Sequence, residues 1–300
     1  MKVVLAVLLV SLSALAAWSA PPPALAAASA QPDRVTVIGD SILTAVEWNP
    51  QPLAILEHGL PRVDLQIAVC RTLIGPGCPF DGERPSNLVD LVQSLGDEIG
   101  STVVVEVGYN DPAQGFAAAV DDSVQALLAA GVERILWVNY HDWVPPYAQL
   151  NAILAQVLAR YPQVTIVDWQ GDSLNRYSWF QSDGIHLVFS GAEALATVIH
   201  DALVRALTPP IVPHGPAAIY AQVGRRFTAR LDVTGGEGPF RWRVMARPLG
   251  RGLHLLADGT LCGTPRTPGQ TTIAVQVSDA WGNSAALRVD LIVRPRGSPL

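Results

Sequence analysis

A serine that follows a short apolar strand is the first residue in this chain that could do covalent chemistry. Residues 35–43 read VTVIGDSIL, so Ser41 stands in the turn where the strand ends. A serine hydroxyl is a weak nucleophile at neutral pH. It needs a base within hydrogen-bond reach, and that base needs a third group to fix its tautomer. His186 and Asp183, in the later sequence DGIHL, are predicted to fill these two roles.

The negative oxygen of a tetrahedral intermediate also needs preorganised hydrogen-bond donors. Asn110 lies in GYND, directly after the apolar run TVVVEV, and its side-chain amide is predicted to be one donor. The backbone N–H of Ser41 is predicted to be a second donor. A third donor is expected from the loop that follows the strand at residues 63–69.

Two rival assignments come from the same chain. Gly-Asp-Ser occurs twice, and by itself this tripeptide predicts only a turn or a helix cap. Ser173, in the second copy, has no GxND segment after it, so Ser41 is favoured as the nucleophile. His141 and Asp142 offer another base and acid, but residues adjacent in sequence are poorly placed to bond each other in these roles.

The motifs GDSIL, GYND and DGIHL, in this order, resemble those of the SGNH (GDSL-type) hydrolase superfamily over residues 34–207. In the second block of that family a glycine backbone N–H joins the oxyanion hole, whereas this chain aligns Cys70 there. A backbone donor survives a change of side chain, so the resemblance implies Cys70 as the third donor. The residues that match the other blocks are Gly39, Asp40, Ser41, Ile42, Gly108, Asn110, Asp111, Asp183 and His186.

The first thirty residues predict a secretory signal peptide. They contain one charged residue, Lys2, then an apolar run at residues 3–17, then small residues with cleavage expected after Ala26 or Ala30. A transmembrane anchor is the rival interpretation, but the apolar run is short and prolines follow it closely. The mature protein is therefore expected to be secreted, periplasmic or at the cell surface, with no membrane-spanning segment.

Export implies an oxidising compartment, in which cysteines close in sequence tend to pair. Cys70 and Cys78 are predicted to form a disulfide beside the expected oxyanion hole, and two free thiols are the alternative. Cys262 is left over and is expected to behave as a small buried apolar residue. No histidine or cysteine cluster has metal-ligand spacing and no glycine-rich phosphate loop follows a strand, so neither a metal nor a cofactor is predicted.

Short β-rich runs alternate with segments of helical spacing, which predicts a parallel sheet with helices on both faces, a three-layer α/β/α fold. In the flavodoxin-like strand order 2-1-3-4-5, Ser41 and Asn110 follow neighbouring strands, where such sheets bind ligands. The predicted strands are residues 35–38, 63–69, 102–107, 134–139 and 164–168, and the predicted helices are residues 85–98, 113–130, 146–160 and 190–207.

Aromatic residues are expected near the ends of these strands, in numbers sufficient to wall an acyl or sugar pocket. One or two of them are expected to contact substrate, and the others to pack in the core or a lid. They are Trp48, Trp143, Tyr147, Trp179 and Phe180.

The chain changes character after residue 208. Prolines concentrate in residues 209–216, which predicts a linker after a catalytic domain at residues 31–208. Apolar runs separated by glycine-rich turns then predict a small antiparallel β-sandwich at residues 217–296. Residues 217–293 resemble bacterial immunoglobulin-like repeats, which implies a spacer or surface-binding module.

Charge is distributed unevenly between the two parts. The net charge of the whole chain is −6, but residues 31–208 have eight arginines and twenty-one acidic residues, whereas residues 209–300 have eleven arginines and five acidic residues. Opposite charges predict that the parts dock on each other or that the second part meets an anionic surface or polymer; a merely solvated arginine-rich region is the alternative. A cell-envelope polymer is an expected partner, and nucleic acid is not.

These features predict an exported serine esterase in which Ser41 is acylated and His186 activates the water that hydrolyses the acyl-enzyme. Acetylated cell-envelope sugars, lipids and small acyl esters are the candidate substrates. An acyltransferase with the same triad, in which a sugar hydroxyl replaces water, is the alternative enzyme. A surface-binding protein with little or no activity is the alternative from another class; the intact triad opposes it, and the altered second block favours it.

Overall fold

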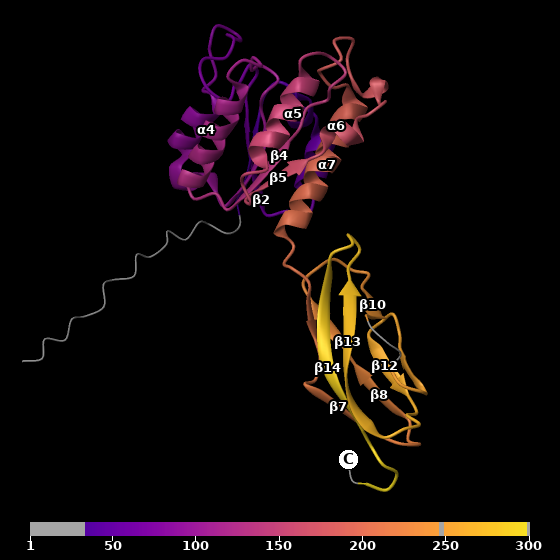
Figure 1. Cartoon of the computed structure of the whole chain (residues 1–300). Coiled ribbons are helices and arrows are strands. Elements are labelled where there is room, and N and C mark those ends of the chain that lie inside the picture. The colour runs from indigo at the N-terminus through magenta and orange to yellow at the C-terminus, as the bar shows by residue number, and fades with distance from the viewer. Residues whose placement is uncertain (1–33, 246–248, 299–300) are drawn as a thin grey trace, which may run out of the picture.

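The structure is a computed structural model of the 300-residue chain, and it describes residues 34–245 and 249–298. An α/β part comes first along the chain and a part made of β-strands follows it (Figure 1). The predicted signal peptide, residues 1–30, lies outside the described residues.

Five parallel strands form the sheet of the α/β part in the order β2-β1-β3-β4-β5, which confirms the predicted flavodoxin-like arrangement. The central strand β3 is buried along its whole length, as its run of valines requires. The strands are β1 (Arg34–Gly39), β2 (Arg62–Ile67), β3 (Thr102–Glu106), β4 (Arg134–Val138) and β5 (Val164–Val167).

Helices flank this sheet in two packed groups. The helices α3, α4 and α5 pack in series, and α1 and α2 pack against α7, which gives the layers of an α/β/α fold. The α-helices are α1 (Thr44–Glu47), α2 (Pro50–Glu57), α3 (Leu88–Leu95), α4 (Phe116–Ala129), α5 (Tyr147–Leu158), α6 (Trp169–Asp172) and α7 (Phe189–Leu207), with 3-10 turns η1 (Gly96–Ile99) and η2 (Tyr177–Trp179).

The four predicted helices are present, and local capping explains where α3 begins. The side chain of Asn87 accepts a hydrogen bond from the backbone N–H of Asp90, so the helix starts at Leu88 rather than at the predicted residue 85. The short helices α1, α2 and α6 were not predicted. They are one or two turns long, too short for apolar periodicity to reveal.

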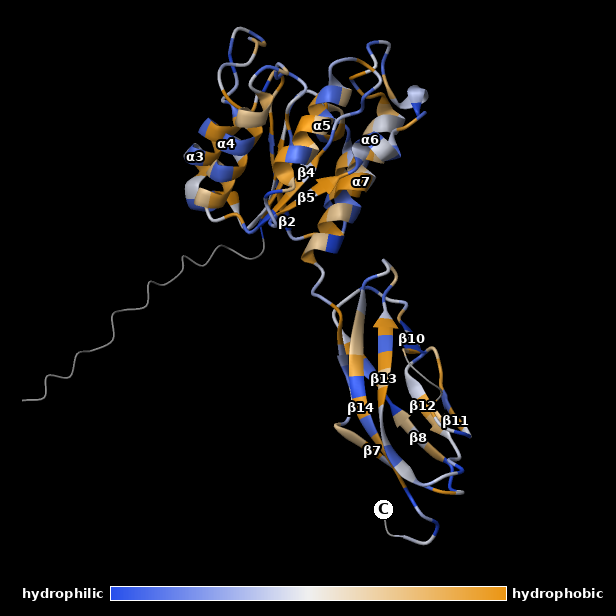
Figure 2. Cartoon of the chain, in the orientation of Figure 1, coloured by the Kyte–Doolittle hydropathy of each residue, from blue (hydrophilic) through white to orange (hydrophobic). Residues whose placement is uncertain are grey.

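Apolar residues of the strands and helices form the core of the α/β part. Figure 2 shows these strands coloured largely as hydrophobic. Val104 in β3, Trp137 in β4 and Leu150 in α5 have no exposed surface. This packed sheet fixes the strand ends that carry the motifs, because close-packed interiors resist small displacements.

The β part contains a four-stranded sheet, β10-β13-β14-β7, and a three-stranded sheet, β11-β12-β8, that share one apolar core. Most of its pairings are antiparallel as predicted, but β7 pairs in parallel with β14. The strands are β6 (Val212–His214), β7 (Ala218–Gln222), β8 (Phe227–Arg230), β9 (Asp232–Thr234), β10 (Arg241–Val244), β11 (Leu253–Leu255), β12 (Thr260–Gly263), β13 (Gly269–Ser278) and β14 (Ser284–Arg294).

Part of the proline-rich segment at residues 209–216 has regular structure. Its strand β6 pairs antiparallel with β9, so this half of the segment is attached to the β part. Within the described ranges, no helix is both long and apolar enough to cross a membrane.

Candidate active site

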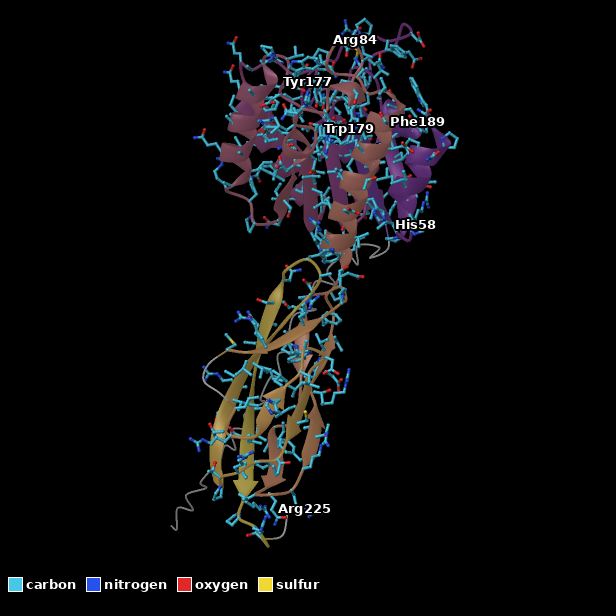
Figure 3. The ribbon with its side chains drawn as sticks, turned by 90° about the vertical axis from the view of Figure 1, so that its right-hand side faces the viewer. His58, Arg84, Tyr177, Trp179, Phe189 and Arg225 are labelled. Atoms are coloured by element: carbon cyan, nitrogen blue, oxygen red, sulfur yellow. A yellow bond between two sulfur atoms is a disulfide. The ribbon has the colours of Figure 1, made fainter. Side chains whose placement is uncertain are left out.

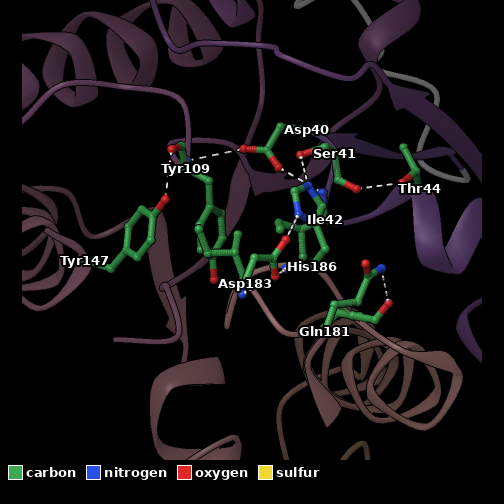
Figure 4. A network of polar contacts seen from close by, with 11 residues as sticks. Asp40, Ser41, Ile42, Thr44, Tyr109, Tyr147, Gln181, Asp183 and His186 are labelled. Carbon is green, nitrogen blue, oxygen red and sulfur yellow. Dashed lines mark hydrogen bonds and ion pairs between the residues drawn. The ribbon is translucent and has the colours of Figure 1, made fainter. Parts of the chain in front are cut away.

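The structure brings together the three residues that the sequence predicts as nucleophile, base and orienting acid (Figure 4). Ser41 stands two residues after β1, and its Oγ lies 3.0 Å from Nε2 of His186. The other ring nitrogen of His186, Nδ1, lies 2.7 Å from Oδ2 of Asp183. With Nδ1 donating to the carboxylate, Nε2 is left as the acceptor for the serine hydroxyl proton.

Backbone amides hold the carboxylate of Asp183 in place. Its Oδ1 accepts hydrogen bonds from the N–H groups of Ile185 and His186, at 2.9 and 3.0 Å. Burial acts to raise the pKa of Asp183, but the hydrogen bonds from the His186 ring and these two amides outweigh it, so this pKa lies below its ordinary value. Asp183 therefore stays ionised where it faces the histidine.

These side chains lie at the surface of the protein. The side chains of His186 and Asp183 are 41% and 44% exposed, and Ser41 is half-buried. A large substrate can therefore approach the serine without first being enclosed.

Asp40, next to Ser41, is completely buried and ties the end of β1 to the end of β3. Its Oδ1 accepts from the N–H of Ile42 at 3.1 Å, and its Oδ2 accepts from the N–H groups of Gly108 and Tyr109 at 3.4 and 3.3 Å and from the amide of Asn110 at 3.4 Å. Burial raises the pKa of Asp40 to about 7, against the lowering effect of the amides. Asp40 thus positions the segments that carry Ser41 and Asn110.

Gly108 allows the end of β3 to lie against Tyr140, which follows β4. Its φ of +145° is rarely adopted by other residues, and a Cβ there would lie 2.0 Å from the hydroxyl oxygen of Tyr140. That hydroxyl donates to the carbonyl of Val107. Any side chain at position 108 would therefore displace the end of β3.

The three expected oxyanion donors lie at the ends of β1, β2 and β3, but only the two backbone donors lack an acceptor. The backbone N–H groups of Ser41 and Cys70 donate to no protein acceptor within the described part of the chain. The amide of Asn110 donates to the carbonyl of Arg71 at 3.1 Å and to Asp40, which fixes its orientation, and Asn110 itself is exposed.

Cys70 adopts the backbone conformation that favours glycine. Its φ is +69°, in the left-handed region, at the position where the resembled family has a glycine. The predicted disulfide joins it to Cys78, with the two Cα atoms 5.2 Å apart. The predicted burial of Cys262 is only partly met, since this free cysteine is half-buried.

Two further buried groups connect the second block to the others. The guanidinium of Arg71 donates to the carbonyls of Gly39 and Ser86, at 3.3 and 2.7 Å. The carboxylate of Asp111 accepts from the N–H of Leu73, and burial raises the pKa of Asp111 to about 6. The three loops that carry the candidate donors are therefore bonded to one another.

Ser173 and His141, the rival residues, bond each other away from solvent. The Nδ1 of His141 lies 2.9 Å from the Oγ of Ser173, and that hydroxyl also donates to the carbonyl of Trp169. Ser173 is fully buried and His141 is 4% exposed. The second Gly-Asp-Ser is thus a structural turn at the end of α6.

The predicted aromatic residues divide into exposed and buried groups. Trp48 and Trp143 are 65% and 51% exposed, whereas Tyr147 and Phe180 are buried and Trp179 is half-buried. Tyr147 donates to the carbonyl of Tyr109, next to the backbone that Asp40 holds (Figure 4).

Sequence reasoning missed Glu106 and Tyr177. Glu106, at the end of β3, is 1% exposed, and one of its carboxylate oxygens has no hydrogen-bond partner among the described residues. Burial, together with the charge of Asp40, holds the pKa of Glu106 well above its ordinary value. The single acidic residue in the apolar run TVVVEV was the sequence signal that could have identified Glu106. Tyr177 belongs to no motif.

Within residues 34–245 and 249–298, no group of three or more metal-binding side chains is arranged to hold a metal ion.

Comparison with known proteins finds distant relatives, and no family model matches the chain. The peptidoglycan O-acetyltransferase OatA of Listeria monocytogenes is 24% identical over 168 residues, which are 55% of this chain and 23% of that protein. The O-acetyltransferase OatA of Staphylococcus aureus is 28% identical over 131 residues, which are 41% of this chain and 21% of that protein. The chain therefore spans less than a quarter of the length of these relatives.

Among solved structures, the chain is similar to the psychrotrophic esterase EstA from Pseudoalteromonas sp., with a TM-score of 0.44 and 17% identity over 58% of this chain and 98% of that one. The α/β part of the chain has the sheet order β2-β1-β3-β4-β5, with Ser41 after β1 and Asn110 after β3. The predicted immunoglobulin-like character of residues 217–293 stays a prediction. In motif order and in sheet order the α/β part resembles the SGNH (GDSL-type) hydrolases, which confirms the resemblance predicted from its sequence.

Proposed function

We propose that this chain is an exported serine enzyme that acts on acyl esters. The observation that carries the proposal is the continuous hydrogen-bonded series from Asp183 through His186 to Ser41, with distances of 2.7 and 3.0 Å. A serine so connected is activated as a nucleophile. The low pKa of Asp183 supports the role of orienting acid, because an ionised carboxylate fixes the tautomer of the imidazole.

In the first step, the Oγ of Ser41 attacks the carbonyl carbon of the ester while Nε2 of His186 takes the hydroxyl proton. The carbonyl electrons move onto its oxygen, and the oxyanion receives hydrogen bonds from the backbone N–H groups of Ser41 and Cys70 and from the amide of Asn110. The two backbone donors are free for this role and held by backbone structure. The Asn110 amide donates to Asp40 and to the carbonyl of Arg71, so it turns from one of these acceptors to reach the oxyanion.

In the second step, the tetrahedral intermediate collapses and the bond to the alcohol oxygen breaks. His186 donates its proton to that oxygen, the alcohol leaves, and the acyl group stays on Ser41. His186 then takes a proton from water as the water oxygen attacks the acyl carbon. The second tetrahedral intermediate collapses, the bond between the acyl carbon and Oγ of Ser41 breaks, His186 returns the proton to Oγ, and the acid leaves. A sugar hydroxyl in place of this water would make the enzyme a transferase.

The substrate we propose is an acetyl ester of a cell-envelope glycan. Support comes from the names of the two relatives, one of which is a peptidoglycan O-acetyltransferase, and from the open position of the triad. The signal-like sequence at residues 1–30 supports export. Hydrolysis is the favoured outcome, transfer to a sugar hydroxyl is the second candidate, and a weakly active surface-binding protein is the third.

A fluorophosphonate probe separates an enzyme from a binding protein, since only an activated serine reacts with it. Wild-type protein and Ser173→Ala should be labelled, and Ser41→Ala should not. Incubation of the wild type with 4-nitrophenyl acetate and chitohexaose then separates hydrolase from transferase: free acetate indicates hydrolysis, and acetylated chitohexaose indicates transfer. Labelling of Ser41→Ala at the wild-type rate would refute the proposed nucleophile.

A further inference from the structure

Two exposed aromatic rings lie against each other on the α/β part. Trp143 follows β4 and Tyr177 begins η2, and their ring centroids are 4.6 Å apart at an angle of 58°. They are 51% and 53% exposed. Large rings usually bury most of their surface, so two neighbouring rings that both face water mark a surface able to bind a partner.

The Trp143 ring also touches the turn that carries the base and the orienting acid. Gly184 stands between Asp183 and His186 with a φ of +68°, and a Cβ added there would lie 3.1 Å from Cε3 of Trp143. The ring edge therefore lies directly on the backbone of this turn.

Tyr177 is joined to the same turn through the segment that follows η2. Phe180 forms an isolated β-bridge with Leu187, and the N–H of Gln181 donates to the carbonyl of His186 at 2.7 Å. Figure 3 shows Tyr177 and Arg84, the latter from the loop between β2 and α3, at the same end of the α/β part. Both rings thus belong to the rim of the site.

The shape of this rim suits a sugar better than a long acyl chain. An acyl chain is best held in an enclosed apolar pocket, whereas the side chains of His186 and Asp183 are more than two-fifths exposed. A pyranose ring has one apolar face of C–H groups and a rim of hydroxyls that remain in water. It can therefore cover an exposed aromatic ring without losing its own hydration.

We propose that Trp143 and Tyr177 form a platform that binds the sugar rings of an acylated glycan next to Ser41. The proposal rests on the proposed function, and it defines the substrate class as an esterified polysaccharide or oligosaccharide. The platform binds the part of the glycan beyond the reacting ester. It contributes to glycan affinity and takes no part in bond making or bond breaking.

Kinetics on two substrates test this role. The variants are Trp143→Ala, Tyr177→Ala and their combination, assayed on O-acetylated chitohexaose and on 4-nitrophenyl acetate. The double variant should raise KM for the glycan about tenfold, which corresponds to about 1.4 kcal/mol of lost binding. Because Trp143 lies on the turn of Asp183 and His186, the test of unchanged turnover uses Tyr177→Ala, whose kcat on the glycan and kinetics on the small ester should stay within about twofold of wild type.

Matched controls separate ring stacking from folding. Tyr220→Ala removes a ring that is 51% exposed in β7, outside the α/β part, and should change neither KM. Trp143→Phe keeps an aromatic face and should restore most of the glycan affinity. An unchanged glycan KM in the double variant, or an equal loss on both substrates in Tyr177→Ala, overturns the platform. If Trp143→Ala does not fold, Tyr177→Ala decides the question alone.

Binding without turnover keeps this proposal distinct from the proposed function. Ser41→Ala is titrated with chitohexaose and followed by saturation-transfer NMR. The platform is supported if Ser41→Ala gives sugar signals and these signals disappear in the protein that also carries the Trp143→Ala and Tyr177→Ala substitutions. This holds even if the wild type hydrolyses no ester. Absent signals in Ser41→Ala overturn the platform, even if the wild type hydrolyses 4-nitrophenyl acetate.

Discussion

The Nε2 atom of His186 lies 3.0 Å from the Oγ atom of Ser41, although 145 residues separate the two in sequence. Ser41 follows the inner strand β1, and His186 comes three residues before α7, which packs against α1 and α2. The contact is thus made by two loops that a packed core holds in place, which is how a serine and a base can be preorganised before substrate binds.

The first prediction concerns the nucleophile and the base. Ser41→Ala and His186→Ala should each lower kcat for 4-nitrophenyl acetate by several orders of magnitude, because triad residues act as a unit; in a serine protease the loss is about 10⁶-fold. Initial rates with matched protein concentrations measure this. Activity near the wild-type level in Ser41→Ala would contradict the assignment.

Ser173→Ala is the matched control for this pair. It changes a serine in an identical tripeptide, but one that is buried and bonded to His141. We expect kcat to remain close to wild type. Thermal stability should fall, because an unsatisfied buried partner costs about 1–3 kcal/mol.

The second prediction concerns Asn110. Asn110→Ala should lower kcat by roughly 10²- to 10³-fold with little change in KM, because the amide is needed mainly where oxyanion charge develops. Steady-state kinetics on one small ester separate the two parameters. A loss carried entirely by KM would instead assign Asn110 to substrate binding.

Asn110→Asp is the informative companion to that variant. It keeps the shape of the side chain but replaces the donor with a carboxylate beside Asp40, which accepts from Asn110 at 3.4 Å. We expect its kcat to be at least as low as that of Asn110→Ala. Recovery of activity in Asn110→Asp would argue against a donor role.

Much of the site could be predicted from the sequence because each motif directly follows a recognisable strand or precedes a helix. Ser41 and Asn110 come after apolar runs, and the ends of neighbouring parallel strands meet at one edge. The sheet order followed from the same logic. The contact of His186 with Ser41, by contrast, was inferred from their chemistry and family resemblance, since no local pattern encodes a pairing between distant loops.

Other features depend on packing that sequence patterns do not record. Glu106 lies in an apolar run. Periodicity could not show that both faces of β3 are buried, or that the carboxyl group of Glu106 is close enough to Asp40 for the charge of Asp40 to raise its pKa. The role proposed for Tyr177 depends on its contact with Trp143, a contact between two loops that no sequence pattern records. The parallel pairing of β7 with β14 likewise joins segments from opposite ends of the β part.

The third prediction concerns the pH dependence of stability. Burial raises the pKa of Asp40 to about 7 and that of Glu106 well above its ordinary value, whereas both groups titrate at about 4 in the unfolded chain. Between these values the two groups bind more protons in the folded protein than in the unfolded chain, so their contribution to the free energy of unfolding should fall as pH rises from about 4 to 7. Urea unfolding at pH 5, 6, 7 and 8 measures this slope.

Glu106→Gln tests the contribution of Glu106 to that slope. The amide is neutral at every pH and nearly the same shape, so the variant should lose less stability between pH 5 and pH 8 than the wild type. Each unit of difference between the folded and unfolded pKa that the substitution removes corresponds to about 1.4 kcal/mol of unfolding free energy. Asp111→Asn, at a carboxyl whose pKa is raised to about 6, should flatten the curve less. An identical slope in wild type and Glu106→Gln would refute this account.

The last prediction concerns the independence of the β part. The apolar core of the α/β part ends with residues of α7, and the core of the β part begins at Ile211, so the two cores share no residue. A chain that ends at Thr208 should therefore fold and keep its turnover on 4-nitrophenyl acetate.

Three arginines on the solvent face of the four-stranded sheet would be lost with the β part: Arg241, Arg243 and Arg288. Binding to an anionic polymer such as poly(glycerol phosphate) should weaken, and most strongly at low salt, where exposed charges are least screened. Misfolding of the shortened chain, or a loss of activity on the small ester, would show instead that the β part belongs to the catalytic architecture.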